Sequence, residues 1–349
     1  TINIGNNSIL APQGNQTIGG TGNIVFADGS GSNRLNVEAG NLTLGSGITV
    51  RGGNCIIGQQ ACVGGAATLT NQGLISADVN GRSITVGVSG EVINQGTMRA
   101  QNGGQLILNT GGGYDNSTGI LLADVGSTVL LNSAAVTGGA LNSNGSGKFV
   151  ASNSSNFLNG VTLNGVLDMA TATGIERISA GGMTLNGTIN IGLNSILAPQ
   201  GNQTISGSGN IVFADGNASN RLNVEAGNLV IGSGVTVRGQ TGVIGQQIFV
   251  GGAANLTNNG TINADAGGTI TVNVTGALTN NGTLRAQNGT LTIQDALTGT
   301  GTLRVDPTGV MNLANTPNTQ GRLVMGAAGS TLNIGTQNLT INTDYTNAN

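Results

Sequence analysis

The chain lacks the residues on which most enzymes and metalloproteins depend. Its 349 residues include no histidine, no tryptophan, two cysteines and a single lysine, Lys148. Histidine is the usual acid–base catalyst at neutral pH and the commonest metal ligand, so its absence weighs against both kinds of site. We therefore expect no catalytic residues, no cofactor and no metal site, and we do not expect an enzyme.

Charged and aromatic residues are also scarce. They make up 7% and 2% of the chain, and the formal net charge is −3. Binding to nucleic acid needs clustered lysine and arginine, so this composition argues against nucleic acid as a partner. No apolar run approaches the roughly 20 residues of a membrane-spanning helix, and no signal peptide opens the chain, so we expect no membrane-spanning segment.

Glycine and short apolar triplets are abundant instead. The chain contains 63 glycines, and 37% of its residues are hydrophobic. The hydrophobic residues alternate with polar ones in triplets such as Leu42-Thr-Leu44, Ile48-Thr-Val50 and Ile84-Thr-Val86. This period of two indicates β-strands, and helical spacing is absent. The sequence predicts an all-β protein whose turns are rich in glycine and asparagine.

The chain contains a long internal repeat. The segment Thr1–Gly52 returns as Thr188–Gly239 with 44 of 52 positions identical, and a third copy of its opening begins near Thr331. We interpret residues 1–187 and 188–330 as two repeat units and residues 331–349 as the start of a possible third unit. The second unit is shorter than the first by the length of two coils, which indicates the loss of whole structural layers from one continuous solenoid.

A shorter period lies within the long one. The segment Leu69–Ala77 matches Val92–Ala100, and Leu256–Ala264 matches Leu278–Ala286, which gives a period of about 22 or 23 residues. We expect each such coil to hold about three short strands that stack in parallel on the next coil at about 4.8 Å. About sixteen such coils would form a solenoid roughly 75 Å long.

Asparagines recur at one position of the short period. When coils stack in register, the amides of such residues hydrogen-bond along the axis as a ladder. Binding of a ligand by an exposed row of amides is the alternative, but asparagine before x-Gly is also what a turn needs. The predicted structural ladder consists of Asn71, Asn94 and Asn116 in the first copy and Asn258 and Asn280 in the second.

Acidic and basic residues recur together in both copies. Each acid precedes an arginine by about the length of one coil, so we expect it to lie one coil beneath that arginine. Ion pairs between coils would fix the register, each contributing under about 1 kcal/mol if exposed. The predicted pairs are Asp28 with Arg51, Asp78 with Arg99, Asp215 with Arg238 and Asp265 with Arg285.

The two cysteines, Cys55 and Cys62, are both present in the first copy and both replaced, by Gly242 and Phe249, in the second. Their joint presence and absence favours a disulfide that closes a small loop, with two buried free thiols as the alternative. A disulfide would indicate an oxidising, extracellular setting.

Two other functions need different patterns. A β-helix that binds or cleaves polysaccharide needs converging acids, whereas the acids here are spread singly along the chain. An ice-binding protein needs a flat threonine array, and the Thr-x-Thr triplets are few. They are Thr68-Leu-Thr70, Thr269-Ile-Thr271 and Thr290-Leu-Thr292.

The motifs resemble those of large bacterial surface proteins. Leu-Thr-Asn-Asn-Gly-Thr-Ile at 256–262, Gly-Val-Thr-Leu-Asn-Gly-Val-Leu-Asp at 160–168 and Gly-Gly-Thr-Ile-Thr-Val at 267–272 are similar to repeats of filamentous haemagglutinins and autotransporter passengers. The resemblance implies a right-handed parallel β-helix at the bacterial cell surface, with a role in adhesion or biofilm cohesion. We therefore expect a structural shaft whose partners are further units of the same fibre, with surface glycans or other cells as additional partners.

Overall fold

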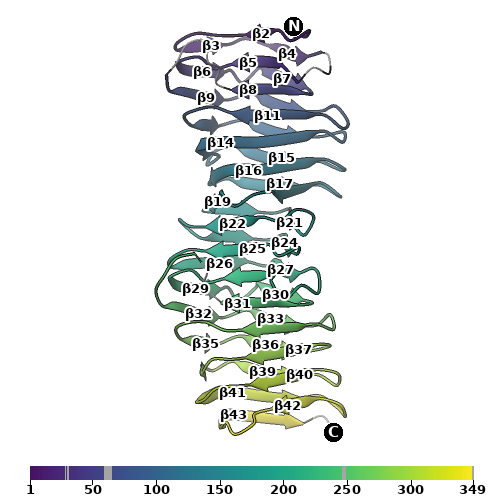
Figure 1. Ribbon diagram of the computed structural model, residues 1–349, viewed down its shortest axis with the longest axis vertical. Coiled ribbons are helices and arrows are strands. Elements are labelled where there is room, and N and C mark those ends of the chain that lie inside the picture. The colour runs from purple at the N-terminus through teal and green to yellow at the C-terminus, as the bar shows by residue number, and fades with distance from the viewer. Residues whose placement is uncertain (28, 30, 59–64, 246–248, 348–349) are drawn as a thin grey trace. The chain divides into compact units, whose positions relative to one another are not determined.

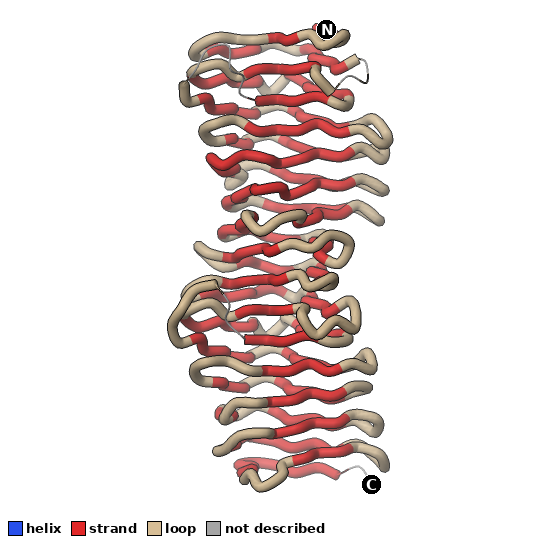
Figure 2. The backbone as a smooth tube through the Cα atoms, viewed as in Figure 1, coloured by secondary structure: helices blue, strands red, loops and turns tan. Residues whose placement is uncertain are grey.

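The chain forms a right-handed parallel β-helix, or β-solenoid, of about 15 turns, close to the sixteen coils expected. The computed structural model describes residues 1–27, 29, 31–58, 65–245 and 249–347. No residue in these ranges is helical, and short strands alternate with loops throughout (Figure 2). The fold therefore follows from the period-two alternation and the glycine-rich turns, as the sequence predicts.

The structure divides into two compact units, Thr1–Asp168 and Met169–Asn349. This division falls earlier in the chain than the boundary between the sequence repeats, so the repeat boundaries themselves stay a prediction. Within each unit the strands stack in three columns, and consecutive members of a column are hydrogen-bonded in parallel (Figure 1). Each column is named after one of its strands.

In the first unit, the β4 column contains β1 (Ile2–Ile4), β4 (Gly22–Phe26), β7 (Ile48–Gly52), β10 (Leu74–Ala77), β13 (Thr97–Ala100), β15 (Ile120–Ala123), β17 (Ala140–Ser143) and β20 (Val161–Leu163). The β5 column contains β2 (Ile9–Leu10), β5 (Asn33–Asn36), β8 (Cys55–Gly58), β11 (Ser83–Gly87), β14 (Gln105–Asp115), β16 (Thr128–Thr137), β18 (Lys148–Ala151) and β21 (Val166–Met169). The β6 column contains β3 (Gln16–Ile18), β6 (Gly40–Leu44), β9 (Ala67–Asn71), β12 (Val92–Asn94), the later parts of β14 and β16, and β19 (Asn156–Asn159).

In the second unit, the β27 column contains β24 (Thr188–Ile191), β27 (Asn210–Phe213), β30 (Thr236–Gly239), β33 (Thr261–Ala264), β36 (Thr283–Ala286), β39 (Thr302–Val305) and the later parts of β41 (Asn318–Met325) and β43 (Leu339–Asn347). The β28 column contains β22 (Ile175–Ile178), β25 (Ile196–Pro199), β28 (Arg221–Asn223), β31 (Gly242–Gly245), β34 (Thr269–Val272), β37 (Thr290–Ile293), β40 (Val310–Leu313) and β42 (Thr331–Asn333). The β29 column contains β23 (Met183–Leu185), β26 (Gln203–Gly207), β29 (Gly227–Ile231), β32 (Ala254–Asn258), β35 (Leu278–Asn280), β38 (Leu297–Thr298) and the earlier parts of β41 and β43.

Coil length varies more than the short sequence period predicts. Val92 pairs with Leu69, which keeps the predicted spacing, but Ile84 pairs with Cys55, so the coil between them is several residues longer. In the second unit Thr302 pairs with Thr283, and that coil is several residues shorter. The differences lie in the loops, where insertions leave the strand register unchanged. The period of 22 or 23 residues therefore holds for some coils and not for others.

Aliphatic side chains fill the interior of each unit. Inward and outward positions alternate along the strands, as in β13, where Met98 and Ala100 are fully buried while Thr97 and Arg99 face outward. Burial of a large aliphatic side chain contributes about 1.5–3 kcal/mol, so the stacked inward residues supply most of the stability. The outward positions are free to carry polar groups, and the candidate site is built from them.

Candidate functional site

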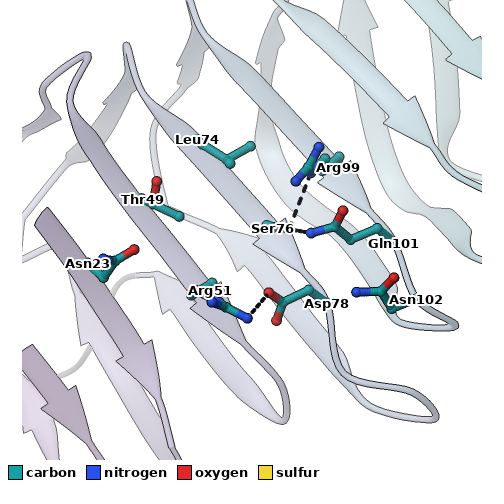
Figure 3. Close-up of a pocket in the computed structure, with 9 residues that line it drawn as sticks. All are labelled: Asn23, Thr49, Arg51, Leu74, Ser76, Asp78, Arg99, Gln101 and Asn102. Atoms are coloured by element: carbon teal, nitrogen blue, oxygen red, sulfur yellow. Dashed lines mark hydrogen bonds and ion pairs between the residues drawn. The ribbon is translucent and has the colours of Figure 1, made fainter. Parts of the chain in front are cut away.

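A shallow groove lies on the outer surface of the first unit, over the β4 column (Figure 3). Its volume is about 180 Å³, and most of its lining is polar. We call it the first groove. It is lined by Asn23, Thr49, Arg51, Leu74, Ser76, Asp78, Arg99, Gln101 and Asn102.

Strand register places the central groove residues in one row. Arg51 of β7 pairs with Ser76 of β10, which pairs with Arg99 of β13. Because parallel strands are about 4.8 Å apart, the two arginines stand about 9.6 Å apart along the column, with the small Ser76 between them. Ser76 leaves space between two long side chains, and this space is the floor of the groove.

Asp78 holds one wall of the first groove. Its Oδ2 forms an ion pair of 2.7 Å with Arg51 Nη2, and its Oδ1 accepts a hydrogen bond of 3.0 Å from the backbone N–H of Gly52. The Asp78 side chain is almost fully buried, whereas half of the Arg51 side chain is exposed. Asp78 is therefore a fixed acceptor for the preceding coil, and both of its oxygens are engaged.

Arg99 stands on the opposite wall with a weaker set of contacts. Its Nε donates to Ser76 Oγ at 3.4 Å, and Gln101 Nε2 donates to the same Oγ at 3.0 Å. No carboxylate in the described part of the chain forms an ion pair with Arg99. Most of the guanidinium's hydrogen-bonding capacity is therefore available to a ligand.

The second unit carries an equivalent groove, the second groove, over the β27 column. Arg238 Nε pairs with Asp265 Oδ2 at 2.8 Å, and Asp265 Oδ1 accepts from the backbone N–H of Gly239 at 3.1 Å. This repeats the Arg51–Asp78–Gly52 arrangement. The groove has a volume of about 340 Å³ and is lined by Asn210, Thr236, Arg238, Asn263, Asp265, Arg285 and Gln287.

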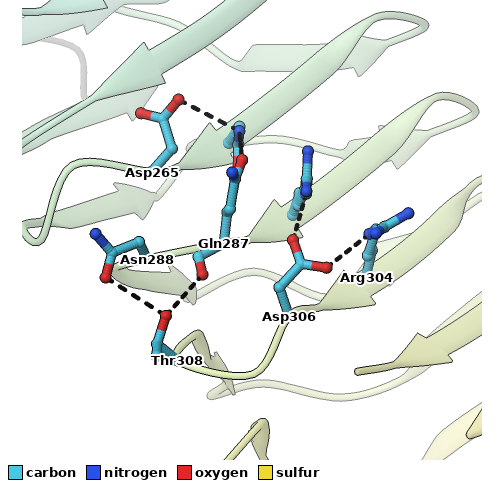
Figure 4. A network of polar contacts seen from close by, with 8 residues as sticks. Asp265, Gln287, Asn288, Arg304, Asp306 and Thr308 are labelled. Carbon is cyan, nitrogen blue, oxygen red and sulfur yellow. Dashed lines mark hydrogen bonds and ion pairs between the residues drawn. The ribbon is translucent and has the colours of Figure 1, made fainter. Parts of the chain in front are cut away.

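The second groove differs from the first in how its other arginine is bound. Arg285 Nε pairs with Asp306 Oδ2 at 2.6 Å, and Arg304 Nε pairs with Oδ1 of the same aspartate at 2.8 Å (Figure 4). Nearby, Asn263 Nδ2 donates to Gln287 Oε1 at 3.0 Å. The second groove is therefore a closed polar network in which each arginine has an acidic partner.

The ion pairs join the predicted residues in a different order. Arg51 pairs with Asp78, Arg238 with Asp265, and Arg285 with Asp306, so each arginine meets an acid later in the chain. The pairings of Asp78 with Arg99 and of Asp265 with Arg285 were wrong. The reason is that each acid begins the loop after its strand, where it lies beside the arginine of the coil before it.

The two remaining acids of the prediction have other surroundings. Asp215 accepts hydrogen bonds from the backbone N–H of Leu193 at 2.8 Å and from Asn220, so its predicted pairing with Arg238 was also wrong. Burial acts to raise the pKa of Asp215, but these bonds and one from the backbone N–H of Asn217 outweigh burial and lower it. Asp28 lies outside the described residues.

The five predicted asparagines form two buried ladders. Asn71 Nδ2 donates to Asn94 Oδ1 at 2.8 Å, and Asn94 donates to Asn116 at 2.7 Å. In the second unit Asn258 donates to Asn280 at 2.7 Å. All five side chains are at most 1% exposed, so the ladders belong to the interior and do not form an exposed binding row.

A glutamine extends the second ladder beyond the predicted residues. Asn280 Nδ2 donates to Gln320 Oε1 at 2.7 Å, although Gln320 lies two coils later in the chain. In the coil between them, the position in register with Asn280 is Gly299, since Thr279 pairs with Thr298. The glycine leaves the space that the longer glutamine crosses. Sequence reasoning missed this contact because it sought identical residues at a fixed spacing.

Buried glutamates were not predicted to have a role. Glu225 Oε2 accepts the backbone N–H groups of Phe249 at 3.1 Å and Val250 at 2.8 Å, and its Oε1 accepts from Asn223. Glu38, at the same repeat position, accepts from Asn36 at 2.9 Å. The segment Asn-Val-Glu-Ala-Gly recurs in both copies, and this recurrence was the sequence signal that could have pointed to a role for the two glutamates.

Glu176 is buried without a hydrogen-bond partner. It occupies an inward position of β22, in register with Leu197 of β25, and neither carboxyl oxygen contacts a donor among the described residues. Burial raises its pKa well above the usual value, although neighbouring Arg177 opposes the shift. Because side chains alternate along a strand, the segment Ile-Glu-Arg-Ile must turn either its glutamate or its arginine inward. A buried charged residue could therefore be predicted from the sequence.

Cys55 is buried and forms no disulfide with another described residue, and desolvation raises the pKa of its thiol. Its predicted partner, Cys62, lies outside the described residues, so the disulfide stays a prediction. A raised pKa keeps the Cys55 thiol protonated and unreactive at neutral pH.

The Thr-x-Thr triplets form only a small array. Thr269 and Thr271 stack on Thr290 and Thr292 in the second unit, and the next coil continues with Val310 and Asn312. In the first unit Thr68 pairs with Asn41 and Thr70 with Thr43, so only one of the two threonines continues into the preceding coil. The array covers two coils.

The described part of the chain contains no group of three or more histidine, cysteine, aspartate or glutamate residues suited to a metal ion. Among the same residues there is also no helix long and apolar enough to cross a membrane. Comparison with protein-family models, with curated proteins and with solved structures gives no match for this chain. The resemblance to filamentous haemagglutinins and autotransporter passengers therefore rests on the repeat motifs alone.

Proposed function

We propose that this chain is a structural shaft of an extracellular bacterial fibre or giant surface adhesin, where it supports adhesion, cohesion between cells or a biofilm matrix. The observation that carries the proposal is the unbroken parallel pairing of strands along all three columns of each unit. Backbone hydrogen bonds in such columns run along one axis, so a pulling force is shared among many of them. Such stacking gives stiffness without a binding pocket or a catalytic centre.

Polar contacts between coils support the same proposal. Inward amide ladders and outward Arg–Asp pairs both connect successive coils, as in Asn71–Asn94 and Arg51–Asp78. A buried polar group that loses its partner costs about 1–3 kcal/mol, so a slip between coils is penalised at each ladder. These contacts fix the register of the stack.

We also propose that the chain is not an enzyme. Each groove brings one aspartate to its lining, and both oxygens of that aspartate are held by a backbone N–H group and an arginine. Hydrolysis of a polysaccharide needs two carboxyl groups on either side of the bond. Incubation with a panel of polysaccharides, followed by a reducing-sugar assay, tests this point, and release of new reducing ends would refute it.

Electron microscopy of the native bacterial surface tests the shaft proposal. Gold-labelled antibodies raised against the chain should decorate thin extracellular fibres, and averaged images should show axial layering of about 4.8 Å. Labelling confined to the cell interior, or discrete particles without layering, would contradict it. Further units of the same fibre are the partners that this proposal requires.

A further inference from the structure

We propose that the first groove binds the carboxylate of an acidic saccharide, and that Arg99 holds this anion. This binding is additional to the role of the chain as a shaft. One arginine of the two grooves differs from the other three. Arg51, Arg238 and Arg285 each form an ion pair with an aspartate of the next coil, whereas Arg99 forms none within the described structure.

The exception has a local cause. Asp124 follows Ala123, the residue paired with Ala100, just as Asp306 follows Val305, the residue paired with Ala286. Asp124 therefore stands where Arg99 would find a partner. Its Oδ1 instead accepts a hydrogen bond of 2.7 Å from Asn144 Nδ2. The exposed Asn144 thus diverts the acid and leaves the guanidinium of Arg99 facing the groove.

The rest of the lining suits the hydroxyl groups of a sugar. Asn23 and Asn102 are exposed at its two ends, and Thr49 and Gln101 lie between them (Figure 3). These side chains both donate and accept hydrogen bonds, as sugar hydroxyls do. A guanidinium adds a planar fork that binds a carboxylate through two parallel hydrogen bonds.

Charge and size define the class of ligand. Arg99 is the one arginine of this lining without an acidic partner in the described structure, so the groove offers a single unpaired positive charge, which matches one carboxylate and not the row of phosphates of a nucleic acid. A volume of about 180 Å³ is below the roughly 300–1,000 Å³ of pockets that enclose a ligand. The groove therefore contacts one carboxylated residue of a longer saccharide.

The groove residues are kept in a part of the internal repeat where other exposed residues differ between the two copies. Asp78, Arg99, Gln101 and Asn102 recur as Asp265, Arg285, Gln287 and Asn288. Exposed neighbours changed between the copies, as in Glu91, which aligns with Ala277. The two linings thus share these residues, but the floor residue is Ser76 in the first groove and Asn263 in the second, and the second arginine has an acidic partner only in the second groove. The second groove is therefore a built-in control.

The test uses the whole chain and two probes. One is an oligosaccharide of four hexuronate units, and the other is the same oligosaccharide with every carboxylate reduced to the alcohol. Binding is followed by titration calorimetry and by amide chemical shifts in low salt. We expect the hexuronate to bind at least about 10-fold more tightly than the neutral probe, because a charge-assisted Arg–carboxylate contact is lost in the latter.

Variants locate the site. Arg99→Gln should weaken hexuronate binding about 10-fold, whereas the matched Arg285→Gln should leave it unchanged. Asn144→Ala should release Asp124 to pair with Arg99 and weaken binding without touching the groove, and adding Asp124→Asn to that variant should restore it. Circular dichroism checks that each variant is folded.

Four results would overturn the proposal. They are unchanged binding in Arg99→Gln, equal losses in Arg99→Gln and Arg285→Gln, equal affinity for the charged and neutral probes, and equal affinity for inorganic phosphate. The last result would identify a site for small anions and not for a saccharide.

Discussion

At the scale of single residues, the inward amides connect coils most directly. Asn94 is both donor and acceptor, since it accepts from Asn71 and donates to Asn116. Its neighbour Gln95 forms a similar bond of 3.2 Å with Gln72 on the exposed side of the coil. The two residues differ mainly in burial, so they allow a matched comparison.

We predict that Asn94→Ala lowers the free energy of unfolding by about 2–4 kcal/mol. It removes the shortest bond of the Asn71 amide, which keeps only contacts of 3.3–3.4 Å to the carbonyls of Gly73 and Thr97, and it leaves the buried Asn116 Oδ1 without its donor. Gln95→Ala should cost less than about 0.5 kcal/mol, because water replaces the lost bond. Urea unfolding followed by circular dichroism measures both. Equal costs would show that burial does not determine the strength of the ladder.

Glu176 gives stability a dependence on pH. Its folded pKa is raised by burial, so the folded state keeps its proton at a pH where the unfolded state has lost it. Stability from this residue is therefore full below the usual glutamate pKa, falls as pH rises above it, and levels off beyond the folded pKa.

We predict that Glu176→Leu is more stable than the natural chain at pH 7 and that the difference narrows at pH 3.5. Leucine matches Leu197, with which Glu176 is in register, so the inward stack accepts it. Urea midpoints at the two pH values measure the effect, with Glu91→Gln on the exposed surface as the control. A difference independent of pH would mean that Glu176 does not titrate in this range.

At the scale of elements, the strands were predictable from the sequence, and the partners in the ion pairs were not. Alternation in segments such as Leu42-Thr-Leu44 reports on the side chains of one strand, and these triplets lie in strands as expected. An ion pair such as Arg51–Asp78 depends on where a loop begins after β10, which the alternation does not record. The members of the ladders were readable because asparagine recurs at one coil position.

The groove could be predicted only in part. Its charged residues were recognised because they recur in both copies. Their roles depend on contacts such as Asn144 with Asp124, and Asn144 belongs to the segment that has no long counterpart in the second copy. Asn144, which lies outside the repeat, thus determines whether Arg99, which lies within it, has an acidic partner. A comparison of the two copies alone does not detect this dependence.

Phe249 and Val250, which follow β31 in the chain, are held to the second unit by the Glu225 carboxylate and by Arg177. Glu225 Oε2 accepts the N–H groups of Phe249 and Val250, and the Phe249 ring lies 5.3 Å from the Arg177 guanidinium. Phe249 and Val250 are nevertheless about 40% exposed, so a protease can reach them once these contacts are released.

We predict that Glu225→Ala increases the rate of chymotrypsin cleavage after Phe249 by at least about 10-fold, because two charge-assisted hydrogen bonds are lost. Glu91→Ala, which removes an exposed acid elsewhere, should leave the rate unchanged. Mass spectrometry of timed digests identifies the site. Cleavage at the natural rate in Glu225→Ala would show that other contacts hold these two residues.

At the scale of the whole molecule, the coil is the unit that can be removed. Ala140 of β17 pairs with Thr162 of β20, and Leu141 pairs with Leu163. Removal of residues 140–161 therefore joins two chain ends at equivalent positions and keeps inward residues inward. The shorter second repeat suggests that such losses are tolerated.

We predict that the chain without residues 140–161 folds with a β-type circular dichroism spectrum and a thermal midpoint within about 5 °C of the natural one, because each coil contacts mainly its neighbours. Removal of residues 140–150 alone should prevent folding of the first unit, since it shifts the following strands out of register. Similar midpoints for the two deletions would contradict this account.

The buried ladders have a direction. Asn71 donates to Asn94 and Asn94 to Asn116, and Asn258 donates to Asn280, so each of these asparagine–asparagine bonds runs from an earlier residue to a later one. A polypeptide that folds from its amino end thus presents an amide donor to the next coil at each of these steps. Each coil that docks is captured by the one before it and then becomes the template for the next. Each ladder bond that forms thus adds to the free energy needed to undock the last coil of the ladder.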